Sequence, residues 1–353
     1  MAVAAHPRPT LASVAARANV SPSTASLAFA GSPKVAAETR ERVFTAAREL
    51  GYAGPDPLAA SLRRGRSGVV GAFIGERLLY AFRDPVAVQL LDGIAEGLGP
   101  HGVGLLLLPG DTGRPGLEQL GRIPLDAAIF ATCGQEGDPA LELLHQRGVP
   151  LVALDGPVVD GVTLIDIEEL SGITELAREL HRLGHRRVAT VTMPLRLDGT
   201  RGWIDDGWRT RNHYRDVRHR LDGVFEVFGR VPAIETASNS VDEGAIAGRI
   251  VLDVPADSRP TLVMAQSDIL AAGVLRAARE LGLRVPEDVS IAGFDGADLP
   301  WLAPELLSTV VQPSDEKGRL GAAAVMELLA GGQPADRTLP VRVRIGTTTG
   351  PPP

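Results

Sequence analysis

Residues 10–30 read TLASVAARANVSPSTASLAFA, and this pattern predicts two short helices joined by a tight turn. Thr10 can cap the first helix with its hydroxyl group. Asn19 lies at the turn, where asparagine is one of the few residues other than glycine that tolerate positive φ. Ser21 and Pro22 suit the N-cap and the first position of a second helix. Two helices in this arrangement predict a helix-turn-helix unit.

A third helix is predicted directly downstream, over about residues 37–50. Apolar residues at helical spacing, among them Ala46, Ala47 and Leu50, would face the core, and Gly51 suits the end of the helix. The alternative is a small helical subdomain without a role in DNA binding, because such turns occur in many helical proteins.

The next segment, residues 54–66, favours the DNA-binding interpretation. Asp56 can cap a helix over residues 57–62, which has barely two turns and would be marginal in water by itself. Arginines 63, 64 and 66 follow, and their charges suit phosphate groups. We therefore expect a hinge helix that folds only on DNA.

Charge is distributed unevenly along the chain. Residues 1–66 hold nine cationic and four acidic side chains, a net charge of +5, whereas the whole chain carries −7 and the remainder therefore −12. A basic head on an acidic body predicts that only the head meets a polyanion. Alone this is weak evidence, because most surface arginines are simply solvated.

The head resembles the lactose-repressor/galactose-repressor (LacI/GalR) family of bacterial transcription regulators, and the resemblance extends through essentially the whole chain. The matching residues include Thr10, Leu11, Val14, Ala15, Val20, Ser21, Ser23, Thr24, Ser26, Val35, Thr39, Arg40, Glu41, Arg42, Val43, Leu50, Gly51, Tyr52, Ala59, Ser61, Leu62 and Arg63. The resemblance implies that the second helix enters the major groove and that Leu62 wedges into the minor groove. It places the following residues against DNA: Thr10, Ser21, Pro22, Ser23, Thr24, Ser26, Leu27, Lys34, Thr39, Arg40, Ala59, Leu62 and Arg63.

Four positions of the head depart from the common family pattern. Leu27 replaces an arginine that contacts bases in many members, and Ala30 replaces a frequent asparagine. Asp56 stands for the usual hinge asparagine, and Ala36 for a common serine cap. Because arginine is a good guanine reader, the operator sequence of better-known relatives cannot be transferred to this chain.

From residue 68 onward, short apolar runs alternate with amphipathic segments, as expected of buried parallel strands and their covering helices. The predicted strands are 69–74, 103–108, 127–131, 150–154, 188–192, 233–236, 261–265, 289–294 and 341–343. The predicted helices are 86–98, 141–146, 173–183, 246–252, 269–281 and 317–329. Two such series predict an α/β core of two doubly wound parallel sheets with a ligand crevice at the carboxyl ends of the strands.

The resemblance implies the same core, similar to periplasmic sugar-binding proteins, and three crossings between lobes near Ile167, Gln312 and Leu339. We therefore expect a helix-turn-helix domain over residues 1–53, a hinge helix and linker over 54–67, and an effector-binding and dimerisation core over 68–350. The expected first lobe is about 68–167 plus 313–339, and the expected second lobe is about 168–312 plus 340–350.

Polar residues near predicted strand ends are candidates for an effector site, since carboxylates and guanidinium groups suit sugar hydroxyls. The candidates, which the resemblance places in the effector cleft, are Asp84, Asp155, Arg220, Ser267, Asp295 and Gln312. Arg220 is expected just before a helix, and aromatic rings could cover an apolar ligand face, namely Phe82, Trp203, Trp208 or Trp301. Ser267 and Gly296 replace frequent family residues, and Asp84 and Asp268 could equally well be helix caps.

Other function classes find less support. The sequence has no P-loop, HExxH or GxSxG motif and no histidine array spaced for a metal, so we expect no enzyme, cofactor or metal. Cys133, the only cysteine, is expected to be a small buried apolar residue. A solute-binding protein with a fused helical head is the alternative, but residues 1–9 lack the apolar region of an export signal.

With 44% hydrophobic residues, 22% charged residues and no apolar run near the roughly 20 residues that span a bilayer, we expect a soluble cytoplasmic protein that does not contact membranes. It should repress transcription from a palindromic double-stranded operator under control of a small polar effector, most simply a sugar. A single helix-turn-helix unit contacts few bases, so we expect a homodimer or a higher oligomer. The polar residues 196–216 form either a mobile loop at the cleft mouth or a solvated segment.

Overall fold

The computed structural model describes residues 9–55, 65–74, 78–110, 114–131, 137–196 and 198–353. The chain divides into two compact units, Met1–Gly68 and Val69–Pro353. The predicted hinge helix, with Ala59, Leu62 and Arg63, lies outside the described residues, as does Cys133. None of the described helices is long and apolar enough to cross a membrane.

The described residues of the first unit form three helices, α1 (Leu11–Arg17), α2 (Pro22–Phe29) and α3 (Ala37–Leu50). The predicted caps are present: Thr10 Oγ1 accepts from the backbone N–H of Ser13 at 3.2 Å, and Ser21 Oγ accepts from that of Thr24 at 3.1 Å. Asn19 has a φ of 52°, and Gly51 ends α3 with a φ of 66°. The predicted helix-turn-helix architecture is confirmed.

Small side chains fill the core of this unit. Its buried members are mainly alanine and valine, namely Val14, Ala15, Ala18, Ala25, Ala28, Val35, Val43, Ala46 and Ala47. Phe29 closes one side of the core, with its ring edge-on to those of Phe44 and Tyr52 at centroid distances of 5.3 and 5.6 Å. Small residues let the three helices approach closely, so that each short helix is held by packing.

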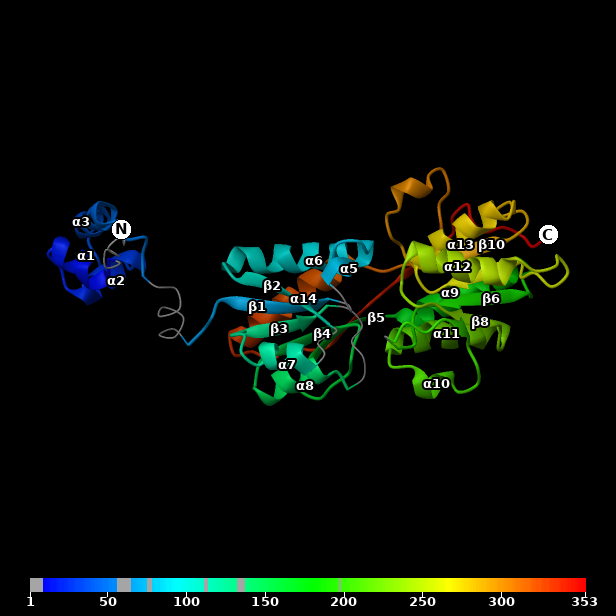
Figure 1. Ribbon diagram of the computed structural model, residues 1–353, viewed down its shortest axis with the longest axis horizontal. Helices are drawn as coiled ribbons and strands as arrows, with labels where there is room; N and C mark the ends of the chain where they lie inside the picture. The colour runs from blue at the N-terminus through cyan, green and yellow to red at the C-terminus, as the bar shows by residue number, and fades with distance from the viewer. Residues whose placement is uncertain (1–8, 56–64, 75–77, 111–113, 132–136, 197) are drawn as a thin grey trace, which may run out of the picture. The chain divides into compact units, whose positions relative to one another are not determined.

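The strands described in the second unit form two sheets (Figure 1). The first has the order β12-β5-β4-β3-β1-β2 with all pairs parallel. Its strands are β1 (Val69–Ile74), β2 (Gly104–Pro109), β3 (Ala127–Phe130), β4 (Leu151–Leu154), β5 (Thr163–Ile167) and β12 (Arg337–Leu339). Its helices are α5 (Leu78–Ala81), α6 (Pro85–Leu98), α7 (Arg114–Leu120), α8 (Pro139–Gln146) and α14 (Ser314–Leu329). Alternate residues of β1 face different cores: Ile74 packs with α6 and α14, and Phe73 packs with α7 and α8.

The second sheet has the order β13-β11-β10-β9-β6-β8-β7, with antiparallel pairs only at its edges. Its strands are β6 (Val188–Thr192), β7 (Gly202–Trp203), β8 (Ala233–Glu235), β9 (Leu262–Ala265), β10 (Ser290–Asp295), β11 (Ser308–Val311) and β13 (Arg342–Arg344). Its helices are α9 (Glu169–Arg182), α10 (Trp208–Arg211), α11 (Arg215–Phe228), α12 (Val241–Leu252) and α13 (Asp268–Glu280). Met264 faces α9 and α11, and Val263 faces α12 and α13. Helices therefore cover both faces of each sheet, as predicted.

The chain passes between the sheets after β5, after β11 and after β12. The first and third passages lie together, because the backbone N–H of Glu168 donates to the carbonyl of Leu339 at 2.9 Å. At the second passage α14 packs closely on α6: a Cβ added to Gly318 would lie 2.3 Å from the Leu90 carbonyl oxygen. Lys317, the residue before that glycine, is completely buried.

Two expectations are wrong in detail. Arg220 does not precede a helix but lies within α11, whose apolar residues Val217, Leu221 and Val224 are buried. Residues 196–216 are not simply a loop, since they contain β7 and α10 and bury Trp208. Short strands with polar residues, such as β5 and β11, were not predicted because their sequences lack an unbroken apolar run.

Candidate DNA-binding surface and effector site

The candidate DNA-binding surface is centred on α2. The hydroxyl group of Ser21 lies 2.8 Å from those of both Ser23 and Thr24, so the amino end of α2 carries a cluster of hydroxyls. Leu27 is 41% exposed on the same short helix. Residues 18–37 include no carboxylate, and Lys34 is their one charged side chain. Hydroxyls and helix amino ends are common phosphate ligands, so this surface suits DNA.

Two predicted DNA contacts also have structural partners within this unit. Thr10 forms a capping box with Ser13. The guanidinium group of Arg40 donates to the backbone carbonyls of Ser32 at 2.8 Å and Val35 at 3.4 Å, both between α2 and α3. Arg40 thus fixes the loop that follows α2.

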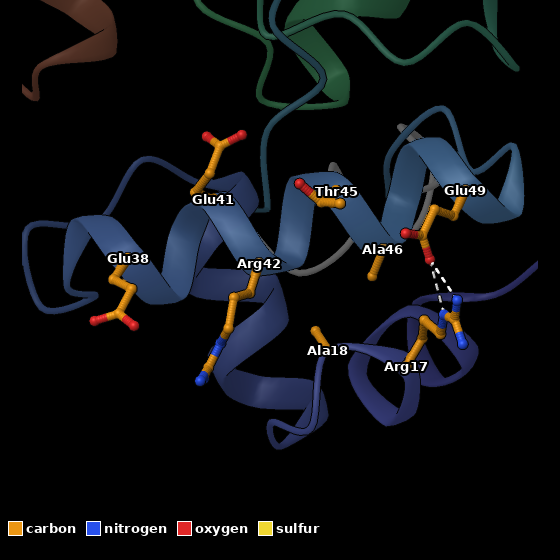
Figure 2. A pocket seen from close by; sticks show the side chains of 8 residues that line it. All are labelled: Arg17, Ala18, Glu38, Glu41, Arg42, Thr45, Ala46 and Glu49. Carbon is orange, nitrogen blue, oxygen red and sulfur yellow. Dashed lines mark hydrogen bonds and ion pairs between the residues drawn. The ribbon is translucent and has the colours of Figure 1, made fainter.

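A second surface of this unit is less suitable for DNA. An open hollow of about 430 Å³ lies between α1 and α3, and Figure 2 shows the side chains that line it. It is lined by three glutamates, two arginines, two alanines and a threonine, namely Glu38, Glu41, Glu49, Arg17, Arg42, Ala18, Ala46 and Thr45. Arg17 and Glu49 form an ion pair of 2.7 Å across it. The excess of carboxylates disfavours phosphate here.

In the second unit, a chain of polar contacts connects the two sheets. Asp155 follows β4 and forms an ion pair with the fully buried ammonium group of Lys317 on α14. Lys317 Nζ also donates to Gln312 Oε1 at 2.8 Å, and Gln312 Nε2 donates to Asp295 Oδ1 at 2.8 Å. Since Asp155 belongs to the first sheet and Asp295 ends β10 of the second, four side chains join the lobes.

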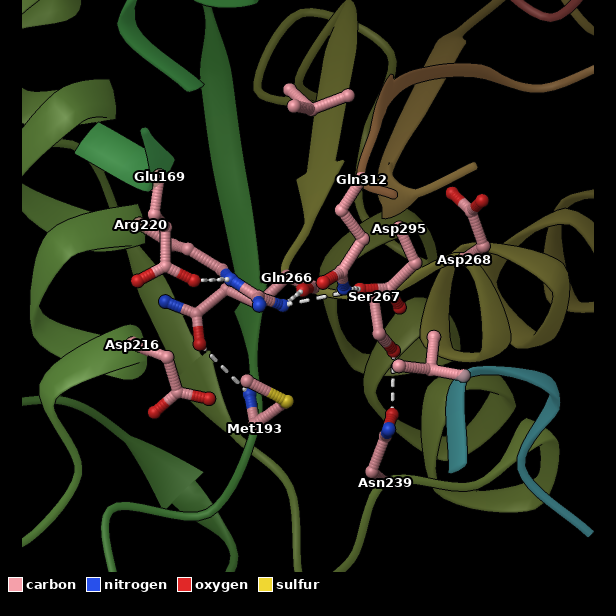
Figure 3. A network of polar contacts seen from close by, with 12 residues as sticks. Glu169, Met193, Asp216, Arg220, Asn239, Gln266, Ser267, Asp268, Asp295 and Gln312 are labelled. Carbon is pink, nitrogen blue, oxygen red and sulfur yellow. Dashed lines mark hydrogen bonds and ion pairs between the residues drawn. The ribbon is translucent and has the colours of Figure 1, made fainter. Parts of the chain in front are cut away.

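Arg220 extends this chain within the second lobe (Figure 3). Its Nε donates to Glu169 Oε1 at 2.8 Å, and its Nη1 donates to the backbone carbonyl of Gln266 and lies 3.7 Å from Asp295 Oδ1. Its guanidinium carbon lies 3.9 Å from the centroid of the Phe294 ring. With 5% exposure, Arg220 is held on several sides.

A shorter series of contacts runs parallel to the first. Ser267 Oγ caps α13 by accepting from the backbone N–H of Leu270 at 3.1 Å and donates to Asn239 Oδ1. Asn239 Nδ2 donates to Asp84 Oδ2 at 3.3 Å. The other carboxylate oxygen of Asp84 caps α6 by accepting from the Val86 N–H at 2.8 Å. Asp84 therefore caps a helix, which is one of the two roles considered for it, and also contacts the other lobe.

Burial changes the acidity of these groups. Burial raises the pKa of Asp155, although the charge of Lys317 acts to lower it. Burial likewise raises the pKa of Asp295 well above its usual value, although the charge of Arg220 acts to lower it. It also raises the pKa of Asp268 to about 7. For Glu169, Arg220 and His219 outweigh burial and lower the pKa. The site thus combines three carboxyl groups with raised pKa values, Asp155, Asp268 and Asp295, with one whose pKa is lowered, Glu169.

The structure brings all six sequence candidates into these two series: Asp84, Asp155, Arg220, Ser267, Asp295 and Gln312. Sequence reasoning missed their partners Lys317, Glu169 and Asn239. The sequence does contain an indication that Lys317 is buried, because this residue lies on the same helix face as Gly321 and Ala324, at the spacing of apolar residues.

The aromatic candidates differ in exposure. Trp208 is 3% exposed and packs against Phe225, so its ring serves the core of the second lobe. Phe82, Trp203 and Trp301 are exposed. The two lobes together offer carboxylates that accept hydrogen bonds and a guanidinium group that donates them. Such a set of groups can bind a small molecule rich in hydroxyl groups.

Fold and site together define a transcription regulator with a helix-turn-helix head and a two-lobed α/β core. Residues 10–54 match the model for bacterial regulatory proteins of the lacI family, and residues 177–349 match that for a periplasmic binding protein-like domain. An HTH-type transcriptional regulator of Mycolicibacterium smegmatis is 35% identical over 365 residues, covering 98% of both chains. The chain belongs to the LacI family of DNA-binding transcription regulators, whose members are not enzymes.

More distant relatives agree with this assignment. The HTH-type transcriptional repressor CytR of Escherichia coli K12 is 28% identical, with 91% of this chain and 90% of CytR covered. A LacI-family regulator structure from Corynebacterium glutamicum has a TM-score of 0.72 at 26% identity and covers 97% of this chain and 99% of that one. The complex of the regulator CelR with cellobiose has a TM-score of 0.67 at 26% identity, with 97% and 100% covered.

Proposed function

We propose that this protein is a cytoplasmic repressor that binds a palindromic operator as a homodimer and responds to a sugar or related polar metabolite. The observation that carries the proposal is the series Asp155–Lys317–Gln312–Asp295, which connects the two lobes through polar side chains. Buried polar side chains from both lobes beside Arg220 are what a polar ligand between them would need.

Two relatives support the finer parts of the proposal. CytR is named a repressor, and CelR has been solved with cellobiose. The carboxylates and Arg220 of this chain offer the acceptors and donors that a sugar requires.

The proposed DNA-binding domain spans residues 1–53, followed by a hinge over 54–67 and the effector core over 68–350. The hydroxyl cluster of α2 would contact phosphates, and Leu27 would contact an apolar base edge in place of an arginine. Leu62 would act as the minor-groove wedge, by resemblance to the family. Two heads related by a two-fold axis would match a palindromic site.

Control by the effector follows from differential affinity. A ligand held by Asp155 of one lobe and by Asp295 and Arg220 of the other favours the arrangement in which both lobes contact it. Such a shift in a dimer would change the spacing of the paired hinges, and marginal hinge helices would then separate from the operator.

A gel-shift titration of the full chain against DNA flanking its own gene tests the proposal. We expect specific binding with a steep dependence on salt, because phosphate contacts release counterions. A panel of neutral sugars should then release the complex. Specific binding without any response to small molecules would contradict effector control, and no specific DNA binding would favour the solute-binding alternative.

A further inference from the structure

The polar network contains two cations, and cations in a ligand site commonly indicate an anionic ligand. Lys317 and Arg220 are 0% and 5% exposed, and both lie in the network described above. Whether they bind an anion depends on how strongly protein carboxylates already engage them.

Both cations are paired inside the protein. Lys317 is held by Asp155 and Gln312. Arg220 is held by Glu169 and the Gln266 carbonyl and lies 3.7 Å from Asp295. A phosphate or carboxylate group would have to displace these partners and leave a buried carboxylate unpaired, which costs several kcal/mol in other proteins.

The carboxylates also outnumber the cations. Five buried or nearly buried carboxyl groups belong to or adjoin the network, namely Asp84, Asp155, Glu169, Asp268 and Asp295, against two buried cations, Lys317 and Arg220. Burial already raises the pKa of Asp155 and Asp295, so the site tolerates its own negative charge poorly. A further anion would raise this electrostatic cost.

Helix amino ends, which otherwise attract anions, carry acidic residues here. Asp84 caps α6, and Glu169 and Asp268 lie in the first turns of α9 and α13. Among the described residues, two buried carboxylate oxygens of these groups have no hydrogen-bond partner, Asp155 Oδ1 and Asp268 Oδ1. The first can only accept a hydrogen bond when ionised, so it requires a donor such as a hydroxyl group.

We infer that the effector carries no negative charge and donates hydrogen bonds from hydroxyl groups to Asp155 and Asp295. The inference rests on the proposed effector function and narrows it to neutral polyols, excluding sugar phosphates and sugar acids. Lys317 then acts as a positioning residue that holds Asp155 and Gln312 for the ligand and does not bind an anion itself.

Matched ligand pairs test the inference on the full chain by isothermal titration calorimetry. The pairs are ribose with ribose 5-phosphate, glucose with glucose 6-phosphate and cellobiose with cellobionate. We expect a neutral member to bind at least tenfold more tightly than its anionic partner. An anionic member that binds equally or more tightly overturns the inference while leaving effector binding intact. Binding by no member of any pair removes the proposed sugar effector, and the inference with it.

Charge variants identify the cause of the discrimination. Asp155→Asn removes one network carboxylate and should reduce the neutral-to-anionic affinity ratio. Asp315→Asn is the matched control, because this carboxylate lies on the same helix as Lys317 but is 57% exposed and pairs with Arg319. The control should leave the ratio unchanged. Equal ratios in both variants and the wild type would show that carboxylate charge does not exclude anions.

Discussion

Asp155 and Asp295 occupy equivalent positions in the two sheets. Asp155 follows β4 and Asp295 ends β10, and each of these strands is third from the edge formed by β12 or β13. Their φ angles are 66° and 122°, and a glycine follows each. Positive φ at residues other than glycine costs about 1–3 kcal/mol and is concentrated at ligand clamps and active sites. The two lobes therefore present matching carboxylates, which Lys317 and Gln312 connect.

Lys317→Met tests the connection between these carboxylates. It leaves Asp155 buried without its cation, so we expect the larger unit to lose about 3–5 kcal/mol of unfolding free energy. Urea unfolding followed by circular dichroism measures this loss. Arg319→Met, on an exposed face of the same helix, should cost less than about 1 kcal/mol.

Adding Asp155→Asn to Lys317→Met should recover part of the loss, because the second change removes the unpaired charge. Losses that simply add in the double variant would show that Asp155 and Lys317 do not stabilise each other.

Ser21→Ala removes the N-cap of α2. We expect the amino-terminal unit to lose about 1 kcal/mol of stability and the protein to bind its operator more weakly. Ser26→Ala changes a hydroxyl within the same helix that caps nothing, and it should weaken operator binding without lowering the melting temperature. The opposite pattern, with Ser26→Ala the less stable variant, would contradict the assigned roles.

Asp268 predicts a dependence of stability on pH. Because burial raises its pKa to about 7, the folded protein retains a proton that the unfolded chain releases at lower pH. The contribution of Asp268 to the unfolding free energy of the wild type should therefore fall as the pH rises from about 4 to 7. Asp268→Asn lacks this component, so its stability relative to the wild type should rise across that range, by a few kcal/mol at most. Parallel profiles from urea midpoints would contradict the assignment.

The sequence predicted the architecture well where local signals agree with tertiary packing. Thr10, Asn19, Ser21 and Gly51 each have a local conformational preference, and the structure uses all of them. Unbroken apolar runs identified the central strands for the same reason. β11 was missed because the buried Ser308 and Thr309 interrupt its apolar character.

The candidate site was predicted only in part. Asp155 and Asp295 follow apolar runs and are visible in the sequence as strand-end carboxylates. Glu169, by contrast, contacts Arg220 across 51 residues, and no local pattern relates them. Lys317 is buried where α14 packs on the first sheet beside Asp155, a tertiary feature.

The central claim is that a small polar effector bridges the lobes at Asp295 and thereby controls operator binding. Its most direct test is a titration of the operator complexes of the wild type and Asp295→Asn with the neutral sugar that shifts the wild-type melting temperature most. We predict similar operator affinity without sugar, release of the wild type by the sugar, and no release of the variant. Release of both proteins at the same sugar concentration would contradict the claim.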